Sequence, residues 1–206
     1  MTPVTAVRPI ALLDPQTHAH PVPSGPPWAE AVEVVDLYDL DRVDLSAYAG
    51  VVVEAMVDQE FLHRRRRQVR SFLDGGGTVV WSGQLFRPWL PGCGAFVAKE
   101  IRSVTDFHVH VVRPHPVFAG VEPADLTFRR GVAGFFARGH HPPPAGAEVL
   151  LALAGGEPVV YVERPSTGGT VFAHAGTGLL DWAEPASTAS RIAPQLVAWI
   201  MENDER

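Results

Sequence analysis

Short apolar runs, separated by segments rich in glycine and proline, recur along the first part of the chain. The run Ile10–Leu13 ends at Asp14-Pro15, and two further runs, Val32–Leu37 and Val51–Val53, follow after loops. Continuous apolar and β-branched runs of this length are typical of strands that are covered on both faces. The pattern therefore predicts three buried strands before residue 54.

A helical pattern follows the third of these runs. Between Gln59 and Leu73, apolar residues approximate one stripe, and arginines supply most of the polar face. Gly75–Gly77 end this predicted helix, since glycine tolerates the left-handed conformation that often follows a helix. Thr78–Trp81 is the next predicted strand. The order strand, helix, strand predicts a parallel sheet.

The last quarter of the chain is also regular. Three more strands are predicted at residues 149–153, 159–163 and 170–173, with Ser166–Gly169 as a hairpin turn between the second and the third. Residues 188–202 have the apolar spacing of an amphipathic helix.

The middle of the chain has a weaker pattern. Apolar residues alternate with histidines over residues 107–111, which predicts an extended strand within residues 99–113. Residues 114–123 are rich in turn-forming residues and predict a connection.

Length and composition indicate an ordinary globular protein. The 206 residues suit one domain, residues 1–206, in which residues 1–8 form a loose lead-in. Hydrophobic residues make up 46% of the chain and charged residues 19%, which excludes a largely disordered protein. The formal charge of −6 argues against nucleic acid as a partner.

Cysteine content and the N-terminal segment bear on the compartment. Cys93 is the one cysteine, so neither an internal disulfide nor a four-cysteine zinc site is possible. The first residues lack the basic start and apolar run of a secretory signal, and no stretch approaches the ~20 apolar residues of a membrane span. A cytoplasmic protein that does not bind membranes is expected.

Several motifs, taken in order, resemble the class I glutamine amidotransferase-like superfamily, and the closest likeness is to its trehalose-utilisation (ThuA-like) members. The motifs are Val51–Val53, Phe72–Gly83, His115–Val121, Pro158–Arg164, Gly169–Phe172 and Leu196–Trp199. The resemblance covers about residues 8–202. It implies an α/β fold of the flavodoxin-like three-layer type, with a mostly parallel central sheet and some antiparallel late strands.

The same resemblance locates the position of the nucleophile. Glutamine amidotransferases carry a cysteine on a tight turn after a strand, and the matching turn here is Trp81–Gln84, with Gly83 at or next to that position. Cys93 lies too far along the chain to replace the missing thiol, so glutamine hydrolysis is not expected. Ser82 is a candidate nucleophile if a base reaches it. The alternative, which we favour, is a Ser-Gly pair that serves the geometry of the turn.

His174 follows a late strand, at about the position of the catalytic histidine of the family. The acidic residue that the family has two positions later is replaced by Gly176, so nothing local would orient the imidazole. His174 either lines a cleft at the carboxyl edge of the sheet, where open α/β sheets bind ligands, or is a solvent-facing loop histidine.

Polar residues cluster at the same predicted edge. Glu54 interrupts an apolar run at the end of a strand, where a carboxylate needs a partner and is a candidate general base. Asp58 is best explained as the cap of the following helix. Glu54, Ser82 and His174 are the candidate catalytic residues. The candidate ligand-binding residues are Asp58, Gln59, Gly83, Gln84 and Arg87.

The nine histidines raise the question of a metal site. His108 and His110 would share one face of a strand, and the pairs His18/His20 and His140-His141 are candidates for additional ligands. Because no conventional spacing with a carboxylate is present, scattered surface histidines are the better explanation, and neither a metal nor a cofactor is predicted.

Three functions remain open at this level. The first is a non-hydrolytic amidotransferase-like domain that binds a small polar ligand or a protein partner, with a homodimer possible. The second is a ThuA-like enzyme that acts on a sugar or polyol through Glu54 and His174. The third is a histidine-ligated metalloprotein. The segment Phe86–Pro91 is a lid, a partner-docking loop or satellite core under any of them.

Overall fold

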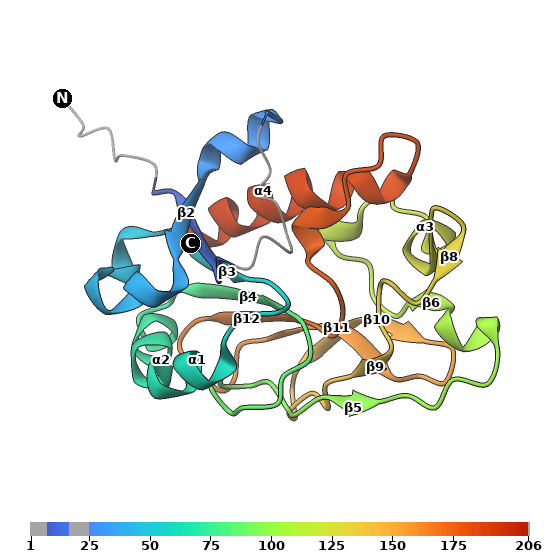
Figure 1. Cartoon of the computed structure of the whole chain (residues 1–206), viewed down its shortest axis with the longest axis horizontal. Coiled ribbons are helices and arrows are strands. Elements are labelled where there is room, and N and C mark those ends of the chain that lie inside the picture. The colour runs from blue at the N-terminus through green and yellow to red at the C-terminus, as the bar shows by residue number, and fades with distance from the viewer. Residues whose placement is uncertain (1–7, 17–24, 206) are drawn as a thin grey trace.

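The computed structural model describes residues 8–16 and 25–205, and its centre is an eight-stranded sheet (Figure 1). The order of the strands is β2-β1-β3-β4-β12-β11-β10-β6. Their bounds are Ile10–Asp14 (β1), Val32–Asp36 (β2), Gly50–Val53 (β3), Thr78–Ser82 (β4), Val109–Val111 (β6), Glu148–Leu153 (β10), Pro158–Glu163 (β11) and Thr170–His174 (β12).

The sheet has a parallel part and an antiparallel part. Strands β2, β1, β3, β4 and β12 are parallel, whereas β11, β10 and β6 continue the sheet in antiparallel pairs. Two small antiparallel pairs lie outside it: β5 (Val97–Ala98) with β9 (Gly139–His140), and β7 (Phe128–Arg129) with β8 (Val132–Ala133). The predicted α/β class, with a mostly parallel sheet and antiparallel late strands, is confirmed.

Helices cover both faces of the sheet (Figure 1). Their bounds are Gln59–Arg64 (α1), Arg66–Asp74 (α2), Pro123–Thr127 (α3) and Ile192–Asp204 (α4). The helix predicted over residues 59–73 is thus broken at Arg65, and the first turn of the predicted C-terminal helix is a 3₁₀ helix, Thr188–Arg191. No helix within residues 8–16 and 25–205 is long and apolar enough to cross a membrane.

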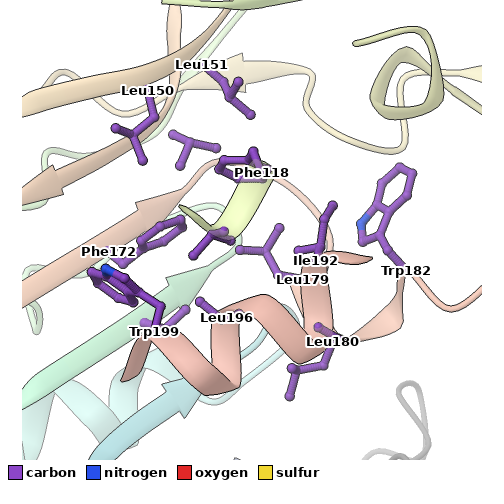
Figure 2. Packing of buried hydrophobic residues seen from close by; sticks show 14 of the residues in the cluster. Phe118, Leu150, Leu151, Phe172, Leu179, Leu180, Trp182, Ile192, Leu196 and Trp199 are labelled. Atoms are coloured by element: carbon purple, nitrogen blue, oxygen red, sulfur yellow. The ribbon is translucent and has the colours of Figure 1, made fainter. Parts of the chain in front are cut away.

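Alternate residues of the central strands point to opposite faces and build two cores. On one face, Val52, Val80 and Phe172 belong to a cluster that includes the buried side of α4. On the other face, Val51 and Val79 pack with the buried residues of α1 and α2. Figure 2 shows the first cluster, where aromatic and aliphatic side chains from the sheet, α4 and the loops before it interdigitate. Each of the central strands is therefore buried on both sides, as its unbroken apolar run indicates.

The strand predicted within residues 99–113 is wrong over most of its length. Only Val109–Val111 forms a strand of the sheet, and residues 104–107 form a 3₁₀ helix. Ser103 and Asp106 make a reciprocal capping box at its start, in which each side chain accepts a hydrogen bond from the backbone of the other end. These local hydrogen bonds compete with strand pairing. Residues 1–7 of the predicted lead-in lie outside the described residues.

Candidate functional site

A pocket of about 610 Å³ opens at the carboxyl edge of β3, β4 and β12. Four loops line it: residues 55–59 after β3, residues 83–86 after β4, residues 175–177 after β12, and residues 134–138 from the middle of the chain. The volume is in the range of small-molecule sites. The place is the one where open α/β sheets commonly hold ligands.

The three candidate catalytic residues lie together at this edge. Ser82 and His174 are direct partners in the pairing of β4 with β12, and Glu54 follows β3 at the same level. All three side chains point to the face of the sheet that carries α4, since residues two positions earlier on each strand belong to that core. All three are buried, and none of them lines the pocket. Each immediately precedes a residue that does.

Glu54 is enclosed by the loop after β12. Its Oε1 accepts a hydrogen bond of 3.1 Å from the backbone N–H of Leu180, and a side chain at Gly178 would overlap its carboxylate. Burial, together with the nearby charge of Asp181, raises the pKa of Glu54 to about 8. The carboxyl group is therefore mostly protonated and neutral near pH 7.

His174 is fully buried, which overturns the alternative of a solvent-facing loop histidine. Its Nε2 lies 3.0 Å from the carbonyl oxygen of Phe136, and its ring packs against the ring of Phe136 at 4.5 Å between centroids. Since a carbonyl only accepts, Nε2 carries the hydrogen. Burial lowers the pKa of His174 to about 3, so the imidazole is neutral.

The turn after β4 has the tight geometry that the sequence predicts. Gly83 has a φ of +145°, and a Cβ there would lie 2.7 Å from the Trp81 ring, so glycine is required. Its carbonyl lies 2.8 Å from Nε2 of the buried His141, whose Nδ1 lies 2.9 Å from the carbonyl of Gly94. Burial lowers the pKa of His141, although both carbonyl contacts act in the opposite direction. His141 thus ties two loops together.

The candidate ligand-binding residues have mixed roles. Asp58 caps α1 by accepting a hydrogen bond of 2.9 Å from the backbone of Phe61, as the capping interpretation predicts. Arg87 is exposed, pairs with Glu60 and does not line the pocket. Gly83, Gln84 and Gln59 do line it, and Gln84 has an exposed side chain.

Gln59 fixes one wall of the pocket. Its Nε2 donates to the carbonyl oxygen of Gln84 at 2.8 Å, and its Oε1 accepts from the backbone N–H groups of Phe86 at 3.0 Å and Arg87 at 3.3 Å. The buried Gln59 side chain thus supplies hydrogen-bond partners to backbone groups of this loop that have none in a strand or helix. Residues 84–87 are held in place by the start of α1.

We expect Gln59→Ala to lower the free energy of unfolding by about 1–3 kcal/mol, because three backbone groups lose their partner. Urea denaturation measures this change, and hydrogen exchange at the Phe86 amide should become faster. Gln84→Ala is the matched control, because that amide side chain makes no hydrogen bond within the described part of the chain. Equal exchange at Phe86 in both variants would contradict the assigned role.

The loop 134–138 was not identified from the sequence, yet it supplies a second wall of the pocket. Thr177 Oγ1 donates to the carbonyl of Phe135 at 3.0 Å, and Arg138 Nε donates to the carbonyl of Gly134 at 3.1 Å. Phe135 is partly exposed at the mouth of the pocket. The segment has no strand or helix period, so only its aromatic pair and its arginine could have drawn attention to it.

Cys93 does not line this pocket. It belongs to the other face of the sheet, where it packs beside Tyr161, and its thiol lies 3.7 Å from the carbonyl of Gly94. Burial raises the pKa of the Cys93 thiol to about 12, so the thiolate needed for nucleophilic attack is not formed near neutral pH.

The pairs His108/His110 and His140-His141 do not gather into one metal site within the described residues. No three His, Cys, Asp or Glu side chains within residues 8–16 and 25–205 are grouped as a metal ion would require. His108 packs edge-on against Phe128 at 6.0 Å between centroids, and His110 is exposed on β6. His18 and His20 lie outside the described residues.

Neither models of protein families nor curated protein sequences match this chain. Among solved structures, a polyextremophilic β-galactosidase from the Antarctic haloarchaeon Halorubrum lacusprofundi is similar, with a TM-score of 0.53 and 18% identity. The similarity covers 97% of this chain and 30% of that one. A cold-adapted β-galactosidase from Rahnella sp. R3 has a TM-score of 0.50 and 16% identity, over 94% of this chain and 31% of that one.

A third similar structure has about the same length as this protein. The cytoplasmic protein STM3548 from Salmonella typhimurium has a TM-score of 0.53 and 11% identity, covering 82% of this chain and 81% of that one. This chain spans less than a third of the β-galactosidase chains that it matches. At these identities the likeness concerns the fold alone. The chain therefore shares its α/β architecture with proteins of different overall size, and its function must be argued from the pocket.

Proposed function

We propose that this protein is a non-hydrolytic amidotransferase-like domain that binds a small polar ligand at the carboxyl edge of its sheet. The observation that carries the proposal is the pocket of about 610 Å³ at the ends of β3, β4 and β12. Side-chain hydrogen bonds from Gln59, Thr177 and Arg138 hold two of its walls in place. A pocket whose walls are fixed before binding loses less conformational entropy when a ligand enters.

The relationship to class I glutamine amidotransferase-like proteins, with a flavodoxin-like fold, is part of this proposal. Its support is the order β2-β1-β3-β4-β12 of the five parallel strands, which follows the flavodoxin-like order 2-1-3-4-5. The glycine turn after β4 and the position of His174 beside it give further support. The closer likeness to ThuA-like proteins rests on the sequence motifs.

The proposed domain does not hydrolyse amides, because the residues at this edge of the sheet lack an activated nucleophile. The turn after β4 carries Ser82 and Gly83 in place of a cysteine, and Ser82 is buried. Cys93 packs on the other face with a protonated thiol. An amide substrate in the pocket would meet no activated nucleophile.

A substitution that fills the pocket tests the proposal. Ala55 lines the pocket and is half-buried, so Ala55→Trp should occupy the site and weaken the binding of any ligand by at least about tenfold. Saturation-transfer NMR with a set of small acids, amides and sugars measures binding to both proteins. Ala124→Trp is the control, because Ala124 is exposed on α3 and does not line the pocket. Fragments that bind Ala55→Trp as well as they bind the original protein would refute the proposal.

An acid–base enzyme acting on a sugar or polyol is the second candidate. The observation in its favour is the row formed by Glu54, Ser82 and His174 at the ends of three neighbouring strands, with a raised carboxyl pKa in Glu54. Burial of all three behind the lining residues argues against direct contact with a substrate. Turnover of nitrophenyl glycosides that is lost in Glu54→Gln would favour this candidate over the first.

A further inference from the structure

The charge on the lining of the pocket indicates the kind of ligand, an inference that rests on the proposed binding function. Among the described residues that line the pocket, Arg138 is the one charged side chain. Glu54, which follows β3 at the same edge, lies behind the lining, and its raised pKa keeps it mostly neutral near pH 7. The described side chains that line the pocket thus carry one positive charge and no negative charge, in a protein with a formal charge of −6. An anionic group on the ligand is favoured there.

Two contacts hold the Arg138 guanidinium in place. Its Nε donates to the carbonyl of Gly134 at 3.1 Å, and its guanidinium lies over the Phe107 ring at 5.6 Å from the centroid. Within the described part of the chain, no acidic side chain forms an ion pair with it. The two terminal NH₂ groups therefore have donors left for a ligand, and a planar guanidinium binds a carboxylate through two parallel hydrogen bonds.

The mouth of the same pocket is apolar. Met56, Phe86 and Phe135 line it and are 71%, 66% and 44% exposed. Exposed large apolar side chains that gather at one place commonly mark a binding site. Aromatic rings and a methionine thioether suit a flat apolar group, because ring–ring and sulfur–ring contacts are favourable.

The backbone of Met56 supports a functional role for this rim. Met56 has a φ of +70°, a left-handed conformation that is uncommon for a residue other than glycine. This conformation occurs in the loop directly after β3, at the pocket, and places an exposed methionine there. Residues held in sparsely populated conformations cluster at ligand sites.

We propose that the pocket binds a small aromatic carboxylic acid, with its carboxylate on Arg138 and its ring against Met56, Phe86 and Phe135. One side chain supplies the charge and three supply the apolar contact. The pocket volume of about 610 Å³ leaves room for one or two fused rings with a short acidic arm.

Matched pairs of probes test the proposal on the full chain. The acids are phenylacetate and 1-naphthylacetate, and the neutral partners are the corresponding amides, which keep the ring and lose the charge. Titrations followed by two-dimensional NMR of the ¹⁵N-labelled protein give the dissociation constants. We expect each acid to bind about 10- to 100-fold more tightly than its amide. Acetate, which has the charge without the ring, should bind more weakly than either acid.

Substitutions of Arg138 test whether this side chain causes the preference for the acids over the amides. Arg138→Gln should remove the difference between acid and amide, and Arg138→Lys should retain only part of it, because an ammonium cannot form the bidentate contact. Arg102→Gln is the control, since Arg102 is an exposed arginine that pairs with Glu100 and does not line the pocket. It should bind both probes like the original protein.

The outcomes separate this inference from the proposed function. Amides that bind as tightly as the acids, with binding lost in Ala55→Trp, would overturn the aromatic acid and leave the binding function standing. Failure of all probes and fragments to bind would refute both. A tripeptide ending in phenylalanine that binds at least about tenfold more tightly than phenylacetate would also overturn the inference, because the ligand would then be a protein terminus.

Discussion

Gly176→Ala is expected to unfold the protein or to lower its free energy of unfolding by about 3–5 kcal/mol. A Cβ at this position would overlap the carbonyl oxygen of Phe136 and lie 2.8 Å from Nε2 of His174. The oxygen and the nitrogen form the 3.0 Å contact that fixes the loop 134–138 over β12. Because a backbone atom is the obstacle, no side-chain rotation can relieve the overlap.

Circular dichroism during urea denaturation measures the loss. Gly75→Ala is the matched control: a Cβ there would lie 3.4 Å from the nearest atom, and the φ of −79° suits any residue. We expect this control to change stability by less than about 1 kcal/mol. A stable Gly176→Ala protein that retains the Phe136–His174 contact in NMR spectra would show that the packing of this loop is looser than the structure indicates.

Glu54→Gln is expected to stabilise the protein relative to the original sequence, and more so at pH 8 than at pH 5. Burial and the charge of Asp181 raise the pKa of Glu54 from 4.5 to about 8 in the folded state. The unfolded chain ionises Glu54 at lower pH than the folded protein does. The contribution of Glu54 to the free energy of unfolding is therefore largest below about pH 4.5. This contribution is lost as the pH rises toward 8.

Glutamine has no such titration and still offers an oxygen to the N–H of Leu180. The shift in the pKa of Glu54 limits its effect on the free energy of unfolding to about 5 kcal/mol. We expect the difference in free energy of unfolding between Glu54→Gln and the original protein to grow by about 2–4 kcal/mol from pH 5 to pH 8. Chemical denaturation at both pH values measures it. Gln84→Ala, which changes no titratable group, is the control and should follow the pH dependence of the original protein. A pH-independent difference for Glu54→Gln would mean that the carboxyl group ionises normally.

The strands of the sheet could be predicted because a strand that is buried on both faces has a continuous run of apolar residues. The runs at β1, β3, β4 and β11 are continuously apolar, and each was placed within a residue or two. Residues 99–113 gave a false strand because the alternation at 107–111 covers only one short edge strand, while hydrogen bonds between Ser103 and Asp106 shape what precedes it. Before residue 109, the local capping hydrogen bonds thus determine the structure, and the alternation of apolar and polar residues does not.

The candidate site was predicted in part. The resemblance to amidotransferase-like proteins pointed to Ser82 and His174, and the end of an apolar run pointed to Glu54; in the structure the three lie in one row. Their burial was not predicted, because it depends on loops distant in sequence: the loop after β12 encloses Glu54, and Phe136 of the loop 134–138 covers His174. Arg138 was also not predicted, because its place at the pocket depends on the fold of the loop 134–138, which no sequence period encodes.

The central place of β12 has a consequence for how this chain is made. Strand β12 lies between β4 and β11, so it joins the half of the sheet built from the first 82 residues to the half built from residues 109–163. A nascent chain leaving the ribosome cannot join these halves until residue 174 has emerged. Until then, β4 presents an unpaired apolar edge, which is the kind of surface that invites aggregation and chaperone binding. Synthesis of this protein is therefore expected to depend on protection of that edge.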